Sequence, residues 1–188
     1  MSILSQEDKT MLLKIARHAL DAAVKGEKMS PLNVQALPAI IKEPGCSFVT
    51  LTIRGELRGC IGALEPTVSL AEDVRDHAVA AALDDYRFPP VRPVELESIA
   101  IEISYLTSPK PLIYSEPPEL PRLLRPGIDG VVLRDGFRRA TFLPQVWQKL
   151  PDPEDFLSHL CQKMGAPPNL WKQKVLQVET YQVDEFHE

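Results

Sequence analysis

The stretch Leu57-Arg58-Gly59-Cys60-Ile61-Gly62 constrains the fold most, because it places two glycines inside a segment whose pattern predicts a β-strand. The preceding segment, residues 48–53, alternates apolar and polar side chains as a half-buried strand does. Gly55-Glu56 lies between the two segments, and glycine adopts positive φ angles readily. We therefore predict an antiparallel hairpin with Gly55-Glu56 as its turn.

The two glycines of the returning strand indicate a close contact with its backbone. Alternation places Arg58, Cys60 and Gly62 on one face of this strand and Gly59 on the other. A glycine inside a strand costs about 0.5–1 kcal/mol relative to alanine, so two of them suggest that another group approaches closely. We expect a cleft here, in which Gly59 and Gly62 admit a ligand or a partner strand.

Four further segments follow the glycine-containing strand in order. They are Ser69-Leu70-Ala71-Glu72-Asp73-Val74, Asp85-Tyr86-Arg87-Phe88-Pro89-Pro90, Gly127-Ile128-Asp129-Gly130 and Thr141-Phe142-Leu143-Pro144-Gln145-Val146-Trp147. Together the five segments resemble the AMMECR domain family, over roughly residues 10–183. The resemblance implies an intracellular α+β domain whose biochemical activity is unsettled. Prokaryotic members are often grouped with a Memo-type protein and a radical-SAM protein, in the AmmeMemoRadiSam system, which suggests both as partners.

The charge balance argues against a general affinity for nucleic acid or anionic membranes, since the net charge is −5. One basic cluster stands out, offset by Asp129 and Asp135. Its members are Arg122, Arg125, Arg134, Arg138 and Arg139. In an acidic chain we interpret this cluster as a solvated hairpin face.

The cysteines and the missing motifs narrow the class further. Cys46, Cys60 and Cys161 are three in number and form no C-x-x-C pair, which is typical of reduced thiols in a cytoplasmic protein. The chain has no H-E-x-x-H, EF-hand or P-loop spacing, so we predict no metal site, and no cofactor is evident. An apolar run of about eighteen residues, as a membrane span needs, is also missing.

Periodicity predicts helices and strands in an irregular order. We expect helices over residues 5–25, 69–84 and 152–165, and strands over 99–105 and 174–183 in addition to the first hairpin. A second hairpin is predicted over residues 130–143, with Asp135-Gly136 as a type I′ turn signal. Because regular βαβ alternation is lacking, the fold class is α+β, with antiparallel hairpins packed against a few helices.

The domain organisation follows from this order of elements. We expect residues 1–188 to form a single AMMECR-type domain with two unequal lobes. One lobe spans about residues 1–108 with the C-terminal strand, and the other about residues 127–173. The proline-rich residues 109–126 are predicted to connect the lobes.

Cys60 is the candidate catalytic residue, because a thiolate is a good nucleophile. Arg58 lies two residues away on the predicted strand, about 7 Å along it. At that distance a unit charge contributes about 0.6 kcal/mol in water and about 2.4 kcal/mol at an effective dielectric near 20. Arg58 alone is therefore insufficient to activate the thiol. We favour the competing interpretation, in which Cys60 is a small residue packed beneath a neighbouring element.

Arg58 and the acidic helix exit have two interpretations each. Arg58 is suited to bind a ligand carboxylate or phosphate through two of its N–H groups; in the structural interpretation it pairs with Asp84 or Asp85 or is simply solvated. Asp84 and Asp85 are suited to acid–base chemistry or to binding a cation, or they have a structural role that Arg87 supports, and the structural role is favoured. The family resemblance adds weight to Asp85 and Arg87 as binding residues.

Two candidates lie later in the chain. Asp129 occupies a Gly-Ile-Asp-Gly turn, where a local side-chain hydrogen bond explains it. Gln145 either presents its amide into a cleft or caps the short helix toward Trp147. For both residues we favour the structural interpretation and keep them as candidate binding residues.

Two functional hypotheses result. In the first, the chain is a binding module for a ligand or a protein partner, and Cys60 only packs. Its candidate binding residues are Arg58, Gly59, Gly62, Asp85, Arg87, Asp129 and Gln145. In the second, it is an enzyme that uses Cys60 as nucleophile or redox thiol and Arg58 to bind an anionic substrate. We favour the first, because no acid–base partner for Cys60 can be named.

Overall fold

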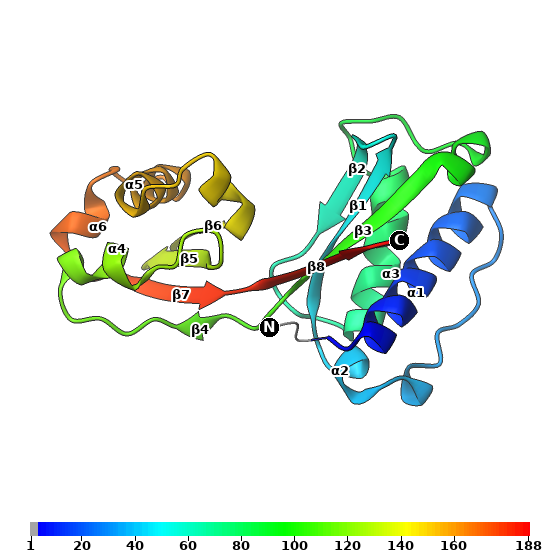
Figure 1. Ribbon diagram of the computed structural model, residues 1–188, viewed down its shortest axis with the longest axis horizontal. Helices are drawn as coiled ribbons and strands as arrows, with labels where there is room; N and C mark the ends of the chain where they lie inside the picture. Colours follow the sequence, from blue (N-terminus) through cyan, green and yellow to red (C-terminus); the bar gives the residue numbers. More distant parts are fainter. Residues whose placement is uncertain (1–3) are drawn as a thin grey trace. The chain divides into compact units, whose positions relative to one another are not determined.

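The computed structural model describes residues 4–188, which form two compact units (Figure 1). Unit 1 comprises residues 4–106 and Asp184–Glu188, and unit 2 comprises Thr107–Val183. Each unit has a four-stranded antiparallel sheet and an apolar cluster of its own. The predicted class, antiparallel hairpins packed with a few helices, is confirmed.

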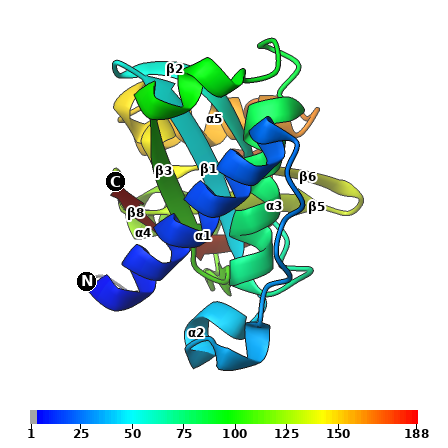
Figure 2. The same ribbon diagram turned by 90° about the vertical axis from the view of Figure 1, so that its right-hand side faces the viewer.

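Unit 1 has a sheet with strand order β2-β1-β3-β8. The strands are β1 (Cys46–Ile53), β2 (Glu56–Gly62), β3 (Ile99–Leu106) and β8 (Val183–His187). The helices are α1 (Gln6–Lys25), α2 (Ala39–Lys42) and α3 (Leu70–Leu83), with the short 3-10 helices η1 (Val34–Ala36) and η2 (Pro93–Ser98). Helices α1 and α3 pack together and cover one face of the sheet (Figure 2).

The two long helices of unit 1 begin where the sequence predicts them. Ser5 and Asp8 form a capping box at α1, and Ser69 and Glu72 form another at α3. The buried face of α3 is made largely of small side chains, which let the helix lie close to the sheet. These are Ala71, Ala78, Ala81 and Ala82.

The first hairpin differs from the prediction by one residue at its turn. Ile53 pairs with Glu56, so the turn is Arg54-Gly55, with φ angles of 54° and 81°. Two positive φ angles define a type I′ turn, whose twist suits a hairpin. The predicted turn, Gly55-Glu56, is wrong because glycine occupies the second of the two left-handed positions, and an arginine occupies the first.

A β-bulge interrupts the alternation predicted for β2. Leu51 pairs with Gly59 and Thr52 pairs with Leu57, which leaves Arg58 without an opposite residue on β1. A bulge re-aims the side chain of the extra residue. The strict alternation from Arg58 to Cys60 therefore does not hold.

Unit 2 has a sheet with strand order β4-β7-β5-β6. The strands are β4 (Lys110–Pro111), β5 (Gly130–Asp135), β6 (Arg138–Phe142) and β7 (Gln177–Tyr181). The helical segments are η3 (Pro117–Glu119), α4 (Leu120–Leu123), η4 (Pro144–Gln148), α5 (Pro153–Lys163) and α6 (Leu170–Gln173). In the core, Trp147 stacks on Phe156 with ring centroids 3.7 Å apart.

Three details of unit 2 correct the sequence-based expectations. Residues 109–126 hold β4, η3 and α4 instead of a plain connection. The strand predicted over residues 174–183 is shorter, and β8, which was not predicted, follows it in the other sheet. In the second hairpin Asp135 pairs with Arg138, so the turn is Gly136-Phe137. Its positive φ, 60°, lies at the first position, as in a type II′ turn, so the predicted type I′ turn is wrong.

Candidate functional site

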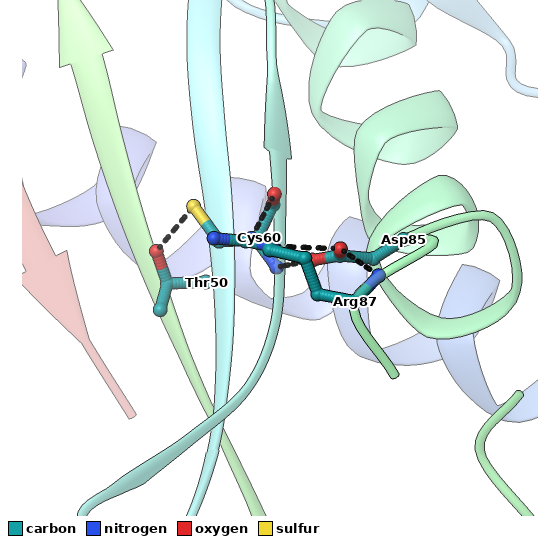
Figure 3. A network of polar contacts seen from close by, with 4 residues as sticks. All are labelled: Thr50, Cys60, Asp85 and Arg87. Carbon is teal, nitrogen blue, oxygen red and sulfur yellow. Dashed lines mark hydrogen bonds and ion pairs between the residues drawn. The ribbon is translucent and has the colours of Figure 1, made fainter. Parts of the chain in front are cut away.

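The backbone of Cys60 is held by two charged side chains (Figure 3). Its N–H donates to Asp85 Oδ2 at 2.8 Å, and its carbonyl accepts from Arg87 Nη2 at 3.1 Å. Strand β2 lies at the edge of its sheet, so both backbone groups would otherwise lack a strand partner. We call this arrangement of Asp85, Arg87 and the Cys60 backbone the clamp.

Asp85 is placed by the end of helix α3 and is fixed by Arg87. The carboxylate is 4% exposed and accepts Arg87 Nε at 2.9 Å and Arg87 Nη2 at 2.6 Å. These hydrogen bonds, more than the bond from the Cys60 N–H, hold the pKa of Asp85 well below its usual range. The same contacts raise the pKa of Arg87. Asp85 is thus a fixed anion and a poor proton carrier near neutral pH.

The thiol of Cys60 points away from the clamp residues. Figure 3 shows its sulfur directed toward Thr50, whose hydroxyl donates to Sγ at 3.3 Å. Cys60 is half-buried, whereas Cys46 and Cys161 are buried. Burial raises the pKa of the Cys46 thiol to about 11. The charged groups near Cys60 therefore bind its backbone and leave the sulfur with a neutral hydroxyl.

The close contact indicated by the two glycines is made by the chain itself. A Cβ atom on Gly59 would lie 2.1 Å from the carbonyl oxygen of Ala81 in α3. A Cβ atom on Gly62 would lie 2.3 Å from the ring of Phe48. Both positions need glycine for packing within unit 1, and neither distance requires a ligand.

Arg58 pairs with an acidic residue that the sequence analysis did not name. Its Nε and Nη2 donate to Glu95 Oε1 at 2.9 Å and Oε2 at 3.3 Å. These bonds lower the pKa of Glu95 to about 2. The structural alternatives considered from sequence, Asp84 and Asp85, are wrong as its partners. Glu95 also accepts the Arg92 N–H at the start of η2. The three-residue spacing from Arg92 to Glu95 is typical of such a helix cap, and it was the only sequence signal for Glu95.

A pocket of about 470 Å³ lies beside Arg58, at the β1–β2 turn. Its lining residues are Ile53, Arg54, Glu56, Leu57, Arg58 and Ser98. Cys60 does not line this pocket, although it follows Arg58 by two residues. The pocket thus lies at the beginning of β2, beside Arg58, and does not include Cys60.

Asp129 and Gln145 lie in unit 2, apart from the clamp in sequence. Asp129 accepts the Arg125 N–H at 2.9 Å and Arg125 Nη2 at 2.6 Å. The Asp129 carbonyl accepts Trp147 Nε1 at 2.7 Å. Gln145 is an exposed residue of η4. Among the candidates, the structure thus joins Cys60, Asp85 and Arg87, and places Asp129 in a local turn.

A second buried carboxylate of unit 1, which the sequence analysis did not single out, joins β1 to α3. Asp73 Oδ2 accepts the N–H and the hydroxyl of Ser47 at 2.7 and 2.6 Å, and contacts His77 Nδ1 at 3.1 Å. The aspartate stands between the serine and the histidine, so the imidazole does not reach the hydroxyl as in a catalytic triad. The four-residue spacing from Asp73 to His77 was the only local signal.

Residues 4–188 also lack two kinds of feature. No group of three or more His, Cys, Asp or Glu side chains is arranged to hold a metal ion. No helix in this range is long and apolar enough to cross a membrane.

Comparisons with known proteins agree with the fold and with the family resemblance. A family model described as AMMECR1 matches residues 13–186. A protein of Methanothermobacter thermautotrophicus is 40% identical over 186 residues, which cover 98% of this chain and 96% of that protein. A protein of Thermofilum pendens is 36% identical over 203 residues, which cover 100% of this chain and 93% of that protein. The crystal structure of the uncharacterized protein PH0010 from Pyrococcus horikoshii matches 95% of this chain and 90% of its own, with a TM-score of 0.77 and 34% identity.

Proposed function

The chain belongs to the AMMECR1 family, and from that premise we propose that it is a binding module whose ligand or protein partner docks beside strand β2. In this proposal Cys60 performs no covalent chemistry. No cofactor is needed, and the protein works in the cytoplasm.

The clamp is the observation that carries the proposal. A cysteine nucleophile needs a neighbouring base or cation directed at its sulfur. Here Asp85 and Arg87 bind the backbone of Cys60, and the sulfur contacts the Thr50 hydroxyl. The arrangement stabilises the edge of β2 and does not prepare a thiolate.

The surface beside the clamp supports binding. Tyr86 lies between the two clamp residues and is 95% exposed, while the Arg87 side chain is 44% exposed. Tyrosine and arginine are enriched at the centres of protein interfaces, and a tyrosine on a fixed turn loses little entropy on binding. The Memo-type and radical-SAM proteins implied by the family resemblance are the candidate partners.

The enzyme hypothesis is kept as the alternative on one observation. The hydroxyl of Thr50 donates to Cys60 Sγ, and such a bond also stabilises a thiolate. In that case Cys60 is a nucleophile or redox thiol, and Arg58 binds the anionic substrate.

Alkylation by iodoacetamide across a range of pH, read by mass spectrometry, tests the proposal. Because Cys46 and Cys161 are buried, the native protein should react only at Cys60. We expect a rate no faster than that of a free cysteine, whose pKa is about 8.5. A Cys46→Ser/Cys161→Ser variant is the control for assignment. Fast reaction well below pH 8 would favour the nucleophile instead.

Partner binding is tested with a purified Memo-type protein and a radical-SAM protein, using calorimetry. Tyr86→Ala should weaken any binding, since it removes the exposed ring and leaves both clamp residues in place. Phe137→Ala is a matched control, because Phe137 is an exposed aromatic on the turn of unit 2. If neither protein binds, these two candidate partners are excluded.

A further inference from the structure

We propose that the pocket at the β1–β2 turn binds the anionic group of a ligand, a phosphate or a carboxylate, through Arg54 and the Nη1 of Arg58. The inference rests on the proposed function, because it names the chemistry of a ligand held beside β2. It concerns the pocket of about 470 Å³, which is within the usual size range of small-molecule sites.

Arg54 occupies a backbone conformation that its side chain does not favour. Its φ of 54° is the only positive φ at a non-glycine residue in the part of the chain that the structure describes. The first position of a type I′ turn usually holds Asn, Asp or Gly. Strained residues of this kind cluster at binding sites. The Arg54 side chain is exposed, lines the pocket and has no ion-pair partner among residues 4–188.

Arg58 is held in place with one donor unused. Glu95 accepts its Nε and Nη2, which fixes the guanidinium plane. Nη1 is buried and has no acceptor within the described residues. A buried cationic N–H without an acceptor is destabilising, and an anionic oxygen would satisfy it. The Arg58 side chain is 13% exposed and lines the pocket together with Arg54.

The charges around the pocket favour an anion. Arg54 and Arg58 line it with one carboxylate, Glu56. Glu95 is shared between Arg58 and Arg92, whose side chain is 76% exposed. Counting Glu95 and Arg92 beside the lining residues, three guanidinium groups stand against two carboxylates. Ser98, at the end of η2, adds a hydroxyl donor to the lining.

Titration of the full chain with inorganic phosphate, followed by the amide NMR signals of residues 53–58, tests the inference. Acetate in a parallel titration serves as the carboxylate probe. Saturable shifts with phosphate alone assign a phosphate-bearing ligand, and shifts with acetate alone assign a carboxylate-bearing one. Shifts with neither probe overturn the inference.

Arg54→Asn is the decisive variant, because it removes the guanidinium and supplies the Asn-Gly pair that a type I′ turn prefers. It should unfold at the same or a higher temperature than the natural protein, yet bind the anion about tenfold more weakly. Arg138→Ala is the matched control, since it removes one exposed arginine near the turn of the other hairpin. Unchanged binding by Arg54→Asn, or equal weakening by the control, overturns the inference. Such a failure leaves the unreactive thiol and the Tyr86 surface of the proposed function intact.

Discussion

The clamp of unit 1 and the Asp129 turn of unit 2 use the same pair of residue types for different purposes. Each has a nearly buried aspartate, 4% exposed at Asp85 and 2% at Asp129. Each aspartate binds a partly exposed arginine side chain, 44% at Arg87 and 56% at Arg125. Each also accepts a backbone N–H. The N–H bound by Asp129 lies four residues away, whereas Asp85 binds the N–H of Arg87, two residues away, and also one that lies 25 residues away on β2.

This difference in range decides what each pair holds together. The Arg125–Asp129 bonds close a turn within one segment of the chain. The Asp85 bonds join the end of α3 to the outer strand of the sheet. A local turn that loses its side-chain bonds can be solvated where it stands, while a tertiary contact that is lost separates two elements. The comparison therefore predicts unequal effects for the same substitution.

Asp85→Ala should have the largest effect, about 2–3 kcal/mol of lost unfolding free energy, because it removes the acceptor of a backbone N–H and the partner of Arg87. Hydrogen exchange should also speed up at the amides of β2. Urea unfolding followed by far-UV circular dichroism measures the free energy. An effect below that of the matching change in unit 2 would contradict the comparison.

Asp129→Ala is that matching change, and we expect a loss of about 1–2 kcal/mol. Both tryptophans, Trp147 and Trp171, lie in unit 2, so their fluorescence reports this loss directly. Since Trp147 donates to the Asp129 carbonyl, its emission should shift slightly in the folded variant. Hydrogen exchange at the amides of β2 should remain unchanged in this variant, which serves as the control.

Acid should remove the contribution of Asp85 in a defined range of pH. Its pKa is lowered in the folded protein from the ordinary value of 3.8, chiefly by Arg87. A lowered pKa stabilises the fold fully above the ordinary value and less and less as pH falls below it. The difference in unfolding free energy between Asp85→Asn and the natural protein should thus be constant from pH 7 to about 5 and shrink below about pH 4. A difference that stays constant down to pH 2 would argue against an ionised clamp.

Cys60→Ala should have the smallest effect, below about 1 kcal/mol. The clamp binds the backbone of this residue, so it survives the loss of the thiol, and only the Thr50 contact disappears. Urea unfolding of Cys60→Ala and Asp85→Ala under the same conditions compares the two losses of unfolding free energy. A Cys60 effect as large as that of Asp85 would show that the side chain itself holds the strand.

The elements with strong local signals were predicted well from sequence. Helix α3 has its capping box, and β1 and β3 alternate regularly, so their positions needed no tertiary information. Strand β8 was missed because only Val183 and Phe186 in it are apolar, too few for a period to emerge. Its place beside β3 depends on pairing between two segments that lie far apart in the sequence.

The sequence predicted which residues belong to the candidate site, but not how they are arranged. Cys60, Asp85 and Arg87 were singled out separately, yet nothing in the sequence indicated that the charged side chains would bind the cysteine backbone. The one-residue shift of the turn to Arg54-Gly55 and the bulge at Arg58 arise from hairpin twist and register. The spacing from Arg92 to Glu95 indicates a capping contact at η2, and nothing in the sequence pairs Glu95 with Arg58, 37 residues earlier.

The clamp also bears on how the protein behaves in concentrated solution. An outer strand with free N–H and carbonyl groups offers a template on which another chain can add a strand. At Cys60 both groups are occupied, and they are covered by ionised side chains that an incoming strand would have to displace. Loss of Asp85 uncovers this position next to Leu57, an exposed apolar residue of the same strand. The clamp thus blocks the addition of another strand at this position of β2.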